Sequence, residues 1–343
     1  MSVLPFDLKK ALEVLASGEG LSEAESRAAV STLFLGDTAE SAVAAFLTAL
    51  RIKGESPEEL AGAVEAVRER MTPFDAGRPV LDTCGTGGDG VNSVNVSTAV
   101  AIVAAACGVA VAKHGNRSAS GNSGSAEVLT ELGVDIEPSH ETLRLCLDEL
   151  GLTFLFAPKF HSALRHVAGV RRLLPFRTMF NLVGPLANPA RPAYQLVGVA
   201  GDRQADLVAE ALLRLGIRRG AVVTGGDGLD EVTLNAPTHV RWIESGHLSF
   251  LTWTPEDFGL GNVAAEELKV DGPADSARKL IALFDGSTGP VRSVVLANAS
   301  AALLVAGKVK SLVDGVNLAA SAIDSGAARQ LLERWKTLSH ATG

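Results

Sequence analysis

Apolar residues recur at every third or fourth position through the first 70 residues, a spacing that places them along one side of a helix. This spacing predicts four helices, over residues 7–15, 22–33, 39–53 and 56–71. Ser22 and Ser56 stand where the second and fourth helices begin, and a serine oxygen there can cap free backbone N–H groups. Since no strand-like alternation interrupts this segment, we expect a small helical domain over residues 1–72.

Past the proline-containing stretch 71–79, the pattern changes to short apolar runs that alternate with helical segments. The runs predict one strand ending at Leu81 and others over residues 109–112, 153–157, 194–199 and 221–224. The helical segments cover residues 99–107, 124–132, 140–150 and 204–215, and helices return through the last 70 residues. Residues 239–243 and 248–252 flank a short polar turn and predict a β-hairpin.

Alternating strands and helices are typical of a mostly parallel sheet. The expected fold is therefore α/β, with the small helical domain followed by a large domain over residues 73–343, in which a mostly parallel central sheet is flanked by helices. Residues 161–190 differ from their surroundings because they are basic and helical at first, and are then punctuated by Gly184-Pro185 and Asn188-Pro189. We expect a loop at that punctuation, and we expect part of the segment to pack on the small domain.

A glycine-rich stretch, DTCGTGGDG, occupies residues 82–90 and precedes a helix of small apolar residues. Four glycines in six positions allow a ligand to approach the backbone closely. The oxygens of Asn95, Ser97 and Thr98 suit the capping of the helix that follows, and a helix start behind free N–H groups is an anion site. Asp89 would repel a bare pyrophosphate, so the loop favours a phosphate that arrives with a divalent cation, or a ribose hydroxyl that needs an acceptor.

Other interpretations of this loop are weaker. Gly85, Gly87 and Gly90 formally match the dinucleotide fingerprint, but the next strand ends in Lys113-His114 where the fingerprint requires an acid. The Walker A pattern fails because no Gly-Lys-Ser/Thr follows. A tight turn without a ligand is the plainest alternative, although such a turn requires one or two glycines rather than four.

A second glycine-rich loop, GGDGLDE, follows the apolar run 221–224. Ligands of open α/β sheets bind outside the carboxyl ends of the strands, which is where both loops are expected. The adjacent carboxylates of Asp230 and Glu231 can hold Mg²⁺, which takes a few carboxylates together with phosphates and waters. A solvated acidic turn is the alternative.

Basic residues form two further groups. Lys113, His114, Asn116 and Arg117 come directly after the second apolar run of the large domain and lead into the polar stretch 118–125, which could wrap phosphate oxygens. Arg171, Arg172 and Arg177 lie in the segment 161–190. Helix arginines are usually solvated, but one of these could hold a substrate carboxylate by paired hydrogen bonds.

The net charge and the cysteines narrow the class of protein to which the chain can belong. A formal net charge of −8 argues against general nucleic-acid binding, which requires a basic face. Cys84, Cys107 and Cys146 are widely spaced, which predicts reduced, buried thiols in a cytoplasmic protein. We expect no signal peptide, because Lys9 and Lys10 are followed by an amphipathic pattern rather than an apolar block. We expect no membrane association, because the longest apolar run, 96–112, is short and interrupted by Gly108.

Five motifs, GTGGD, NVST, KHGNR, FNLVGPLANP and GLDEVTL, stand in an order and spacing that resemble the anthranilate phosphoribosyltransferases of tryptophan biosynthesis. The resemblance covers nearly the whole chain. It implies a homodimer that transfers phosphoribose from phosphoribosyl pyrophosphate (PRPP) to the amine of anthranilate with a pair of Mg²⁺ ions per subunit. It leaves open any contact with anthranilate synthase.

The resemblance also implies site residues, each by its position in a motif. The PRPP-binding residues would be Gly85, Gly88, Asp89, Ser93, Asn95, Val96, Ser97, Thr98, Lys113, His114, Gly115, Asn116, Arg117, Ser118, Ala119, Ser120, Gly121 and Ser125. The anthranilate-binding residues would be Gly85, His114, Asn116, Arg171, Gly184 and Pro185, and the metal ligands would be Ser97, Asp230 and Glu231. No side chain would act as acid or base, and Lys113 would assist electrostatically.

Two rival functions fit parts of this pattern. A pyrimidine nucleoside phosphorylase-like enzyme would bind phosphate and a nucleoside, but it is not expected to carry GTGGD, KHGNR and the second acidic loop together. A non-catalytic relative that binds PRPP or nucleic acid is disfavoured by the net charge of −8 and by the presence of both Asn116 and Arg171.

Overall fold

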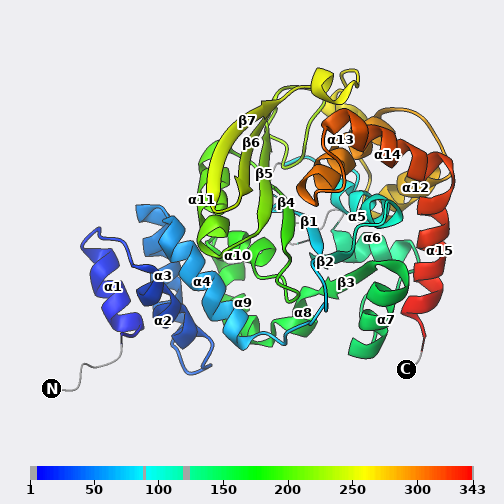
Figure 1. Ribbon diagram of the computed structural model, residues 1–343. Coiled ribbons are helices and arrows are strands. Elements are labelled where there is room, and N and C mark those ends of the chain that lie inside the picture. The colour runs from blue at the N-terminus through cyan, green and yellow to red at the C-terminus, as the bar shows by residue number, and fades with distance from the viewer. Residues whose placement is uncertain (1–5, 88–89, 119–123, 342–343) are drawn as a thin grey trace.

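The computed structural model describes residues 6–87, 90–118 and 124–341. A bundle of helices forms the N-terminal part, drawn in blue in Figure 1: α1(Leu8–Ala16), α2(Glu23–Leu33), α3(Glu40–Lys53) and α4(Pro57–Arg70). Ser22 and Ser56 cap α2 and α4 as predicted, each in a capping box with the glutamate three residues later. The four predicted helices of this segment are therefore confirmed.

A single sheet forms the centre of the large part of the molecule. Its strands are β1(Leu81–Gly85), β2(Val111–Gly115), β3(Leu152–Phe156), β4(Tyr194–Gly198), β5(Arg219–Gly225), β6(Thr238–Glu244) and β7(His247–Trp253). They lie in the order β3-β2-β1-β4-β5-β6-β7, and β3 to β5 in this order are parallel. The predicted hairpin is β6 and β7, which run antiparallel at one edge. The expected α/β fold with a mostly parallel sheet is confirmed.

The strand order reverses between β1 and β4. The chain moves outward from β1 through β2 to β3, and then returns to the other side of β1 to lay down β4 and β5. In such sheets a crevice opens at the carboxyl ends of the strands on either side of the reversal. The topology therefore predicts a ligand site among the residues that follow β1, β4 and β5.

Helices cover both faces of the sheet (Figure 1). One core cluster joins strand residues such as Leu196 and Val223 to α5(Val96–Ala106), α6(Ser125–Glu131), α7(His140–Leu150), α12(Pro273–Phe284), α13(Pro290–Val305), α14(Leu312–Asp324) and α15(Ala327–Ser339). A second cluster joins their neighbours Val197 and Val222 to α11(Asp202–Arg214) and to the N-terminal bundle. Successive strand residues point to opposite faces, so each strand stabilises both layers.

The segment 161–190 connects the bundle to the sheet. It contains the short helices η1(Ser162–Leu164), α9(Arg165–Leu173) and α10(Phe180–Leu186), preceded by α8(Ala157–Phe160). Val167, Val170 and Phe180 are buried in the same core cluster as the bundle helices. The expected loop at Gly184-Pro185 is wrong, because both residues lie in the last turn of α10. A proline so close to a helix end removes one hydrogen bond and leaves the rest of the helix intact.

The central strands extend further than the sequence pattern predicted. β1 continues through Asp82 to Gly85, and β2 continues through Lys113 to Gly115. Polar residues and glycines made these positions resemble loops, but the polar side chains of Asp82, Thr83, Lys113 and His114 are buried in the sheet. The remaining short helices are η2(Pro255–Phe258) and η3(Ala265–Leu268).

Two smaller expectations concern the membrane and the cysteines. Among the described residues, no helix has both the length and the apolar character that crossing a bilayer requires. All three cysteines are free; Cys107 and Cys146 are buried, whereas Cys84 is only partly buried, contrary to expectation. Cys84 lies near the end of β1, where the sheet opens to the rim described below.

Candidate functional site

The two glycine-rich loops touch each other at the carboxyl rim of the sheet. The backbone N–H of Gly87 donates to Asp230 Oδ2 at 2.7 Å, and the N–H of Thr86 donates to the carbonyl of Gly198 at 2.9 Å. Residues after β1 and β5 and the last residue of β4 are thereby joined at the reversal of strand order. The sequence placed both loops at this rim, and the hydrogen bond between Gly87 and Asp230 brings them together there.

Glycines make this close approach possible. A Cβ added to Gly198 would lie 1.6 Å from the carbonyl oxygen of Asp230, and one added to Gly85 would lie 2.5 Å from Asp230 Oδ2. Real Cβ atoms are not found at such distances, so any side chain at either position would push the second loop away. Gly87 has a φ of 63°, which favours glycine for a different reason.

The second loop is fixed by residues that the sequence did not single out. Asp227 accepts a hydrogen bond from Thr233 Oγ1 at 2.7 Å, which closes the loop on itself. The buried side chain of Asn298, on α13, accepts from the N–H of Val232 at 2.9 Å and donates to its carbonyl at 2.8 Å. The backbone that follows Glu231 is therefore held in place before any ligand is bound.

The helix start predicted to receive phosphate is α5. Asn95 caps it by accepting from the N–H of Thr98 at 3.0 Å, while its own N–H donates to Ser276 Oγ at 3.0 Å. Ser97 and Thr98, expected among the capping residues, lie instead in the first turn behind Val96. Ser93 precedes the helix and forms an isolated bridge with Lys269.

Lys113 lies inside the sheet rather than at the end of its strand. Its side chain is 1% exposed, and Nζ donates to the carbonyl of Thr83 at 2.5 Å and to Ser97 Oγ at 3.1 Å. Burial lowers the pKa of Lys113, while the nearby charges of Asp82 and Glu231 act in the opposite direction. The lysine therefore links β1 to the first turn of α5.

Asp82 is a further buried charge that the sequence analysis missed. Its carboxylate is fully buried, and it accepts from the N–H of His114 at 3.1 Å and from Asn188 Nδ2 at 2.8 Å. Burial raises the pKa of Asp82 to about 6, against the charge of Lys113 and the Asn188 hydrogen bond, which lower it. The signal in the sequence that could have identified Asp82 was an acidic residue inside an apolar strand.

His114 forms a pair with a histidine that the sequence analysis also missed. The Nε2 atoms of His114 and His161 lie 3.1 Å apart, and both rings are buried. Burial lowers the pKa of His161 to about 4 and that of His114 well below its ordinary value. Both rings are therefore neutral near pH 7, and the Nε2–H of one ring donates a hydrogen bond to Nε2 of the other.

The residues at the end of β2 and just after it make close contacts with one another and with their neighbours. A Cβ on Gly115 would lie 2.2 Å from Ser125 Oγ, which donates to the carbonyl of Asn116 at 3.4 Å. The Arg117 guanidinium lies over the ring of Phe156, 5.8 Å from its centroid. The N–H of Ser118 donates to the carboxylate of Glu127 on α6.

Arg171 projects a cation with no polar partner among the residues that the structure describes. It lies on α9, is partly buried, and places its guanidinium over the Phe180 ring at 5.5 Å from the centroid. Burial lowers the pKa of Arg171. Phe180 begins α10, so Arg171 lies against the helix that carries Gly184 and Pro185.

Five predicted residues cannot be placed. Gly88, Asp89, Ala119, Ser120 and Gly121 lie outside the described residues. For the metal, the described part of the chain contains no group of three or more His, Cys, Asp or Glu side chains that could together hold a metal ion. Asp230, Glu231 and Ser97 carry side-chain oxygens, which are the ligand type that Mg²⁺ takes together with phosphates and waters.

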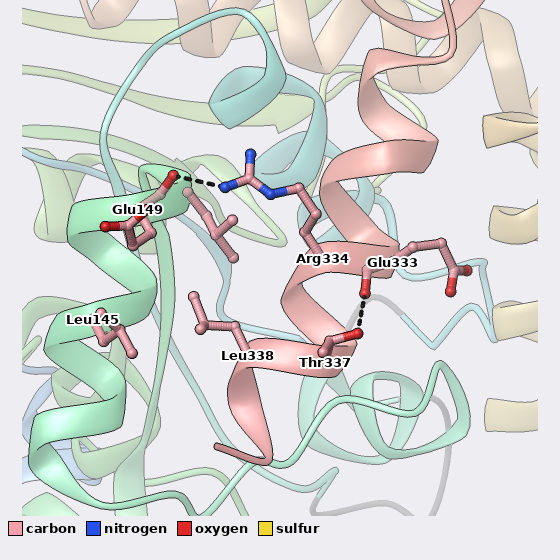
Figure 2. A pocket seen from close by; sticks show the side chains of 7 residues that line it. Leu145, Glu149, Glu333, Arg334, Thr337 and Leu338 are labelled. Atoms are coloured by element: carbon pink, nitrogen blue, oxygen red, sulfur yellow. Dashed lines mark hydrogen bonds between the residues drawn. The ribbon is translucent and has the colours of Figure 1, made fainter. Parts of the chain in front are cut away.

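Described residues line a cavity away from the rim and another beside it. A groove of about 540 Å³ lies between α7 and α15, where Leu145 faces Leu338 and Arg334 reaches the carbonyl of Glu149 (Figure 2). It contains none of the predicted site residues. A second cavity of about 270 Å³ borders Thr86 and Arg177, beside the first glycine-rich loop.

Comparison with known proteins identifies the family of this chain. The model of the glycosyl transferase family a/b domain matches residues 77–329, and that of the family's helical bundle domain matches residues 9–71. The anthranilate phosphoribosyltransferase of Methylobacterium radiotolerans is 50% identical over 323 residues, which are 94% of this chain and 94% of the relative.

Solved structures show the same likeness. The Thermus thermophilus anthranilate phosphoribosyltransferase has a TM-score of 0.91 at 43% identity, covering 96% of this chain and 99% of that chain. The Saccharomyces cerevisiae enzyme in complex with PRPP and Mg has a TM-score of 0.89 at 29% identity and 97% coverage of both chains. In complex with 4-fluoroanthranilate, its TM-score is 0.87 at 28% identity and 97% coverage of both. The chain therefore belongs to the anthranilate phosphoribosyltransferases, within the glycosyl transferase family whose two domain models it matches.

Proposed function

We propose that this chain transfers the phosphoribosyl group of PRPP to the amine of anthranilate, in tryptophan biosynthesis. The products are N-(5-phosphoribosyl)anthranilate and pyrophosphate. The bond from the anomeric carbon to pyrophosphate breaks, a bond to nitrogen forms, and the amine proton passes to solvent. The observation that carries this proposal is the contact of Gly87 with Asp230, which closes one rim from two glycine-rich loops.

PRPP is bound at this rim. The first loop, the start of α5 and the end of β2 supply backbone N–H groups and hydroxyls to the phosphates, as expected of an anion site at a helix start. The residues proposed for this role are those implied by the motifs, from Gly85 to Ser125. Ser97, Asp230 and Glu231 would hold Mg²⁺, which neutralises phosphate charge when it is bound.

Lys113 stabilises the leaving group by its charge. Negative charge develops on pyrophosphate as the glycosidic bond breaks, and a preorganised cation lowers the energy of that state. The hydrogen bonds of Lys113 to Thr83 and Ser97 fix the ammonium group in advance. No side chain is required as a base, since the anthranilate amine is already a neutral nucleophile and positioning it provides the gain.

Anthranilate is held through its carboxylate by Arg171. A guanidinium that is partly buried, packed on Phe180 and without a polar partner among the described residues has its donors available for a carboxylate. His114, Asn116, Gly184 and Pro185 would line the rest of the anthranilate site. We further propose a pair of Mg²⁺ ions per subunit, a homodimer, a cytoplasmic location, and a domain boundary between residues 72 and 73.

The loss of anthranilate fluorescence tests the activity. We expect the signal to fall only when PRPP, Mg²⁺ and the protein are all present, and to stay constant when any one is omitted. Product identity follows from mass spectrometry of the reaction mixture. Constant fluorescence in the complete mixture, with the folded protein verified by circular dichroism, would refute the proposed function.

A further inference from the structure

Arg177 bonds two successive carbonyl groups of the first glycine-rich loop. One guanidinium nitrogen donates to the carbonyl of Thr86 at 2.5 Å and the other donates to the carbonyl of Gly87. Arg177 lies 90 positions further along the chain than Gly87, between α9 and α10. A planar guanidinium matches two neighbouring acceptors in a way that a lysine ammonium does not.

These bonds complete the hold on one peptide of the loop. In the peptide between Thr86 and Gly87, the N–H of Gly87 donates to Asp230 and the carbonyl of Thr86 accepts from Arg177. Arg177 also donates to the carbonyl of Gly87, and the N–H of Thr86 donates to the carbonyl of Gly198. The loop is therefore fixed by the second acidic loop on one side and by the segment between α9 and α10 on the other. Any shift of the Gly87 peptide changes the position of Arg177 or breaks its bonds.

The segment that carries Arg177 also carries the proposed anthranilate site. Arg171 precedes Arg177 by six positions, and Gly184 follows Arg177 by seven. The next residue, Thr178, donates its N–H to Asn181 Oδ1 at 3.0 Å, which fixes the start of α10. Arg177 thus stands at the junction between the PRPP loop and the helices that position Arg171, Gly184 and Pro185.

Packing does not hold the Arg177 side chain in place. The side chain is exposed and borders the cavity of about 270 Å³, whose other walls include Arg51, Leu182 and Arg203. Its position is therefore set by the two carbonyls rather than by a surrounding core. Because water competes for exposed hydrogen bonds, the contact can form and break as the loop binds or releases a ligand.

We propose that Arg177 is a positioning residue that couples PRPP binding to anthranilate binding. PRPP bound against the first loop sets the position of the Thr86 and Gly87 carbonyls, these carbonyls hold Arg177, and Arg177 fixes the segment from which anthranilate is bound. Because such coupling is reciprocal, anthranilate must strengthen PRPP binding by the same factor. This role rests on the proposed function, since it requires both ligands to bind at the sites assigned above.

Calorimetric titration with an unreactive pair of ligands tests the coupling. Benzoate carries the carboxylate and ring of anthranilate but lacks the amine, so its complex with PRPP and Mg²⁺ does not turn over. The coupling factor is the ratio of the PRPP dissociation constants without and with saturating benzoate. We expect a wild-type factor of roughly fivefold or more, within the usual range for coupled sites.

Substitutions test whether the coupling depends on Arg177. Arg177→Ala should bring the factor close to one, and Arg177→Lys should give an intermediate value because an ammonium cannot bridge the two carbonyls in the same way. Arg172→Ala is the matched control, since Arg172 is an exposed arginine of the same segment with no hydrogen bond or ion pair among the described residues. This control should keep the wild-type factor.

The outcomes separate this inference from the proposed function. A wild-type factor of one, or a wild-type factor retained by Arg177→Ala, would overturn the role of Arg177 while the fluorescence assay still showed transfer. Absence of transfer in wild type would overturn the proposed function instead. If Arg177→Ala does not fold, Arg177→Lys decides the question, since a wild-type factor in that variant contradicts the requirement for a bridging guanidinium.

Discussion

The carboxylate of Asp230 accepts a hydrogen bond of 2.7 Å from the backbone N–H of Gly87, although 143 positions separate the two residues in the chain. Asp230 belongs to the loop after β5 and Gly87 to the loop after β1. The bond shows that one side chain both closes the rim of the sheet and stands at the proposed metal site. Substitutions in either loop should therefore affect the same ligand.

The acidic pair should set the magnesium requirement. Replacing Asp230 with Asn and Glu231 with Gln keeps the shape of both side chains and removes their charges. Since even residues behind metal ligands alter affinity by 10–100-fold, we expect the Mg²⁺ concentration for half-maximal rate to rise roughly tenfold or more. Glu210→Gln, an exposed position on α11, is the control. An unchanged Mg²⁺ dependence in the double variant would exclude the pair as ligands.

Arg171 should govern anthranilate affinity. A charge-assisted hydrogen bond contributes about 1.5–3 kcal/mol, so Arg171→Ala should raise the anthranilate KM roughly tenfold or more. The PRPP KM should stay nearly constant, because Arg171 lies on α9 and not in a glycine-rich loop. Steady-state kinetics with each substrate varied provides the measurement. A wild-type anthranilate KM in this variant would remove Arg171 from the site.

Gly85 should be intolerant of a methyl group. A Cβ there would lie 2.5 Å from Asp230 Oδ2, so Gly85→Ala must displace the carboxylate that holds Gly87. We expect a folded protein with PRPP affinity reduced by about an order of magnitude, as expected for the loss of a charged hydrogen bond. Gly220→Ala is the matched control on β5, since its Cβ meets no atom closer than 3.6 Å. Equal PRPP affinity in both variants would contradict the proposed contact.

The buried carboxyl of Asp82 should leave a signature in stability against pH. Burial raises its pKa from 3.8 to about 6, so the folded protein keeps a proton that the unfolded chain has lost. The resulting stability is fully present below the unfolded pKa and is lost as the pH rises through about 6. Asp82→Asn does not titrate, and its amide places a donor against the donors of His114 and Asn188.

Urea denaturation of wild type and Asp82→Asn at several pH values measures this effect. The free energy of unfolding of wild type relative to the variant should fall by about 1 kcal/mol between pH 5 and pH 7.5. Wild type relative to Glu210→Gln should show no such trend, since Glu210 is exposed. A difference that stays flat, or that grows with pH, would show that Asp82 is ionised throughout this range.

Periodicity was sufficient to predict the helical bundle, the parallel strands and the hairpin, because these elements depend on local spacing and on caps such as Ser22 and Ser56. The two glycine-rich loops were recognised because glycine has few other reasons to recur so densely. Strand ends were placed too early, at Leu81 and Ala112, since polar residues buried in a sheet resemble a loop in the sequence.

The missed contacts share one property, which is that the two partners lie far apart in the chain. Asn188 bonds Asp82 across 106 positions and Arg177 bonds Gly87 across 90. His161 meets His114 across 47 positions, in a segment expected to be merely basic and helical. No local pattern marks such contacts, because they arise only when the sheet brings the strand ends together.

Crystals soaked with PRPP and Mn²⁺ test the central claim most directly, because the anomalous signal of manganese locates the metal without reference to the protein. The claim is that a metal-bound sugar diphosphate lies between the two glycine-rich loops. The account predicts manganese coordinated by Asp230 or Glu231 and by PRPP oxygens, with the diphosphate against the first turn of α5. Manganese and PRPP bound elsewhere, with both carboxylates outside the metal's coordination sphere, would contradict it.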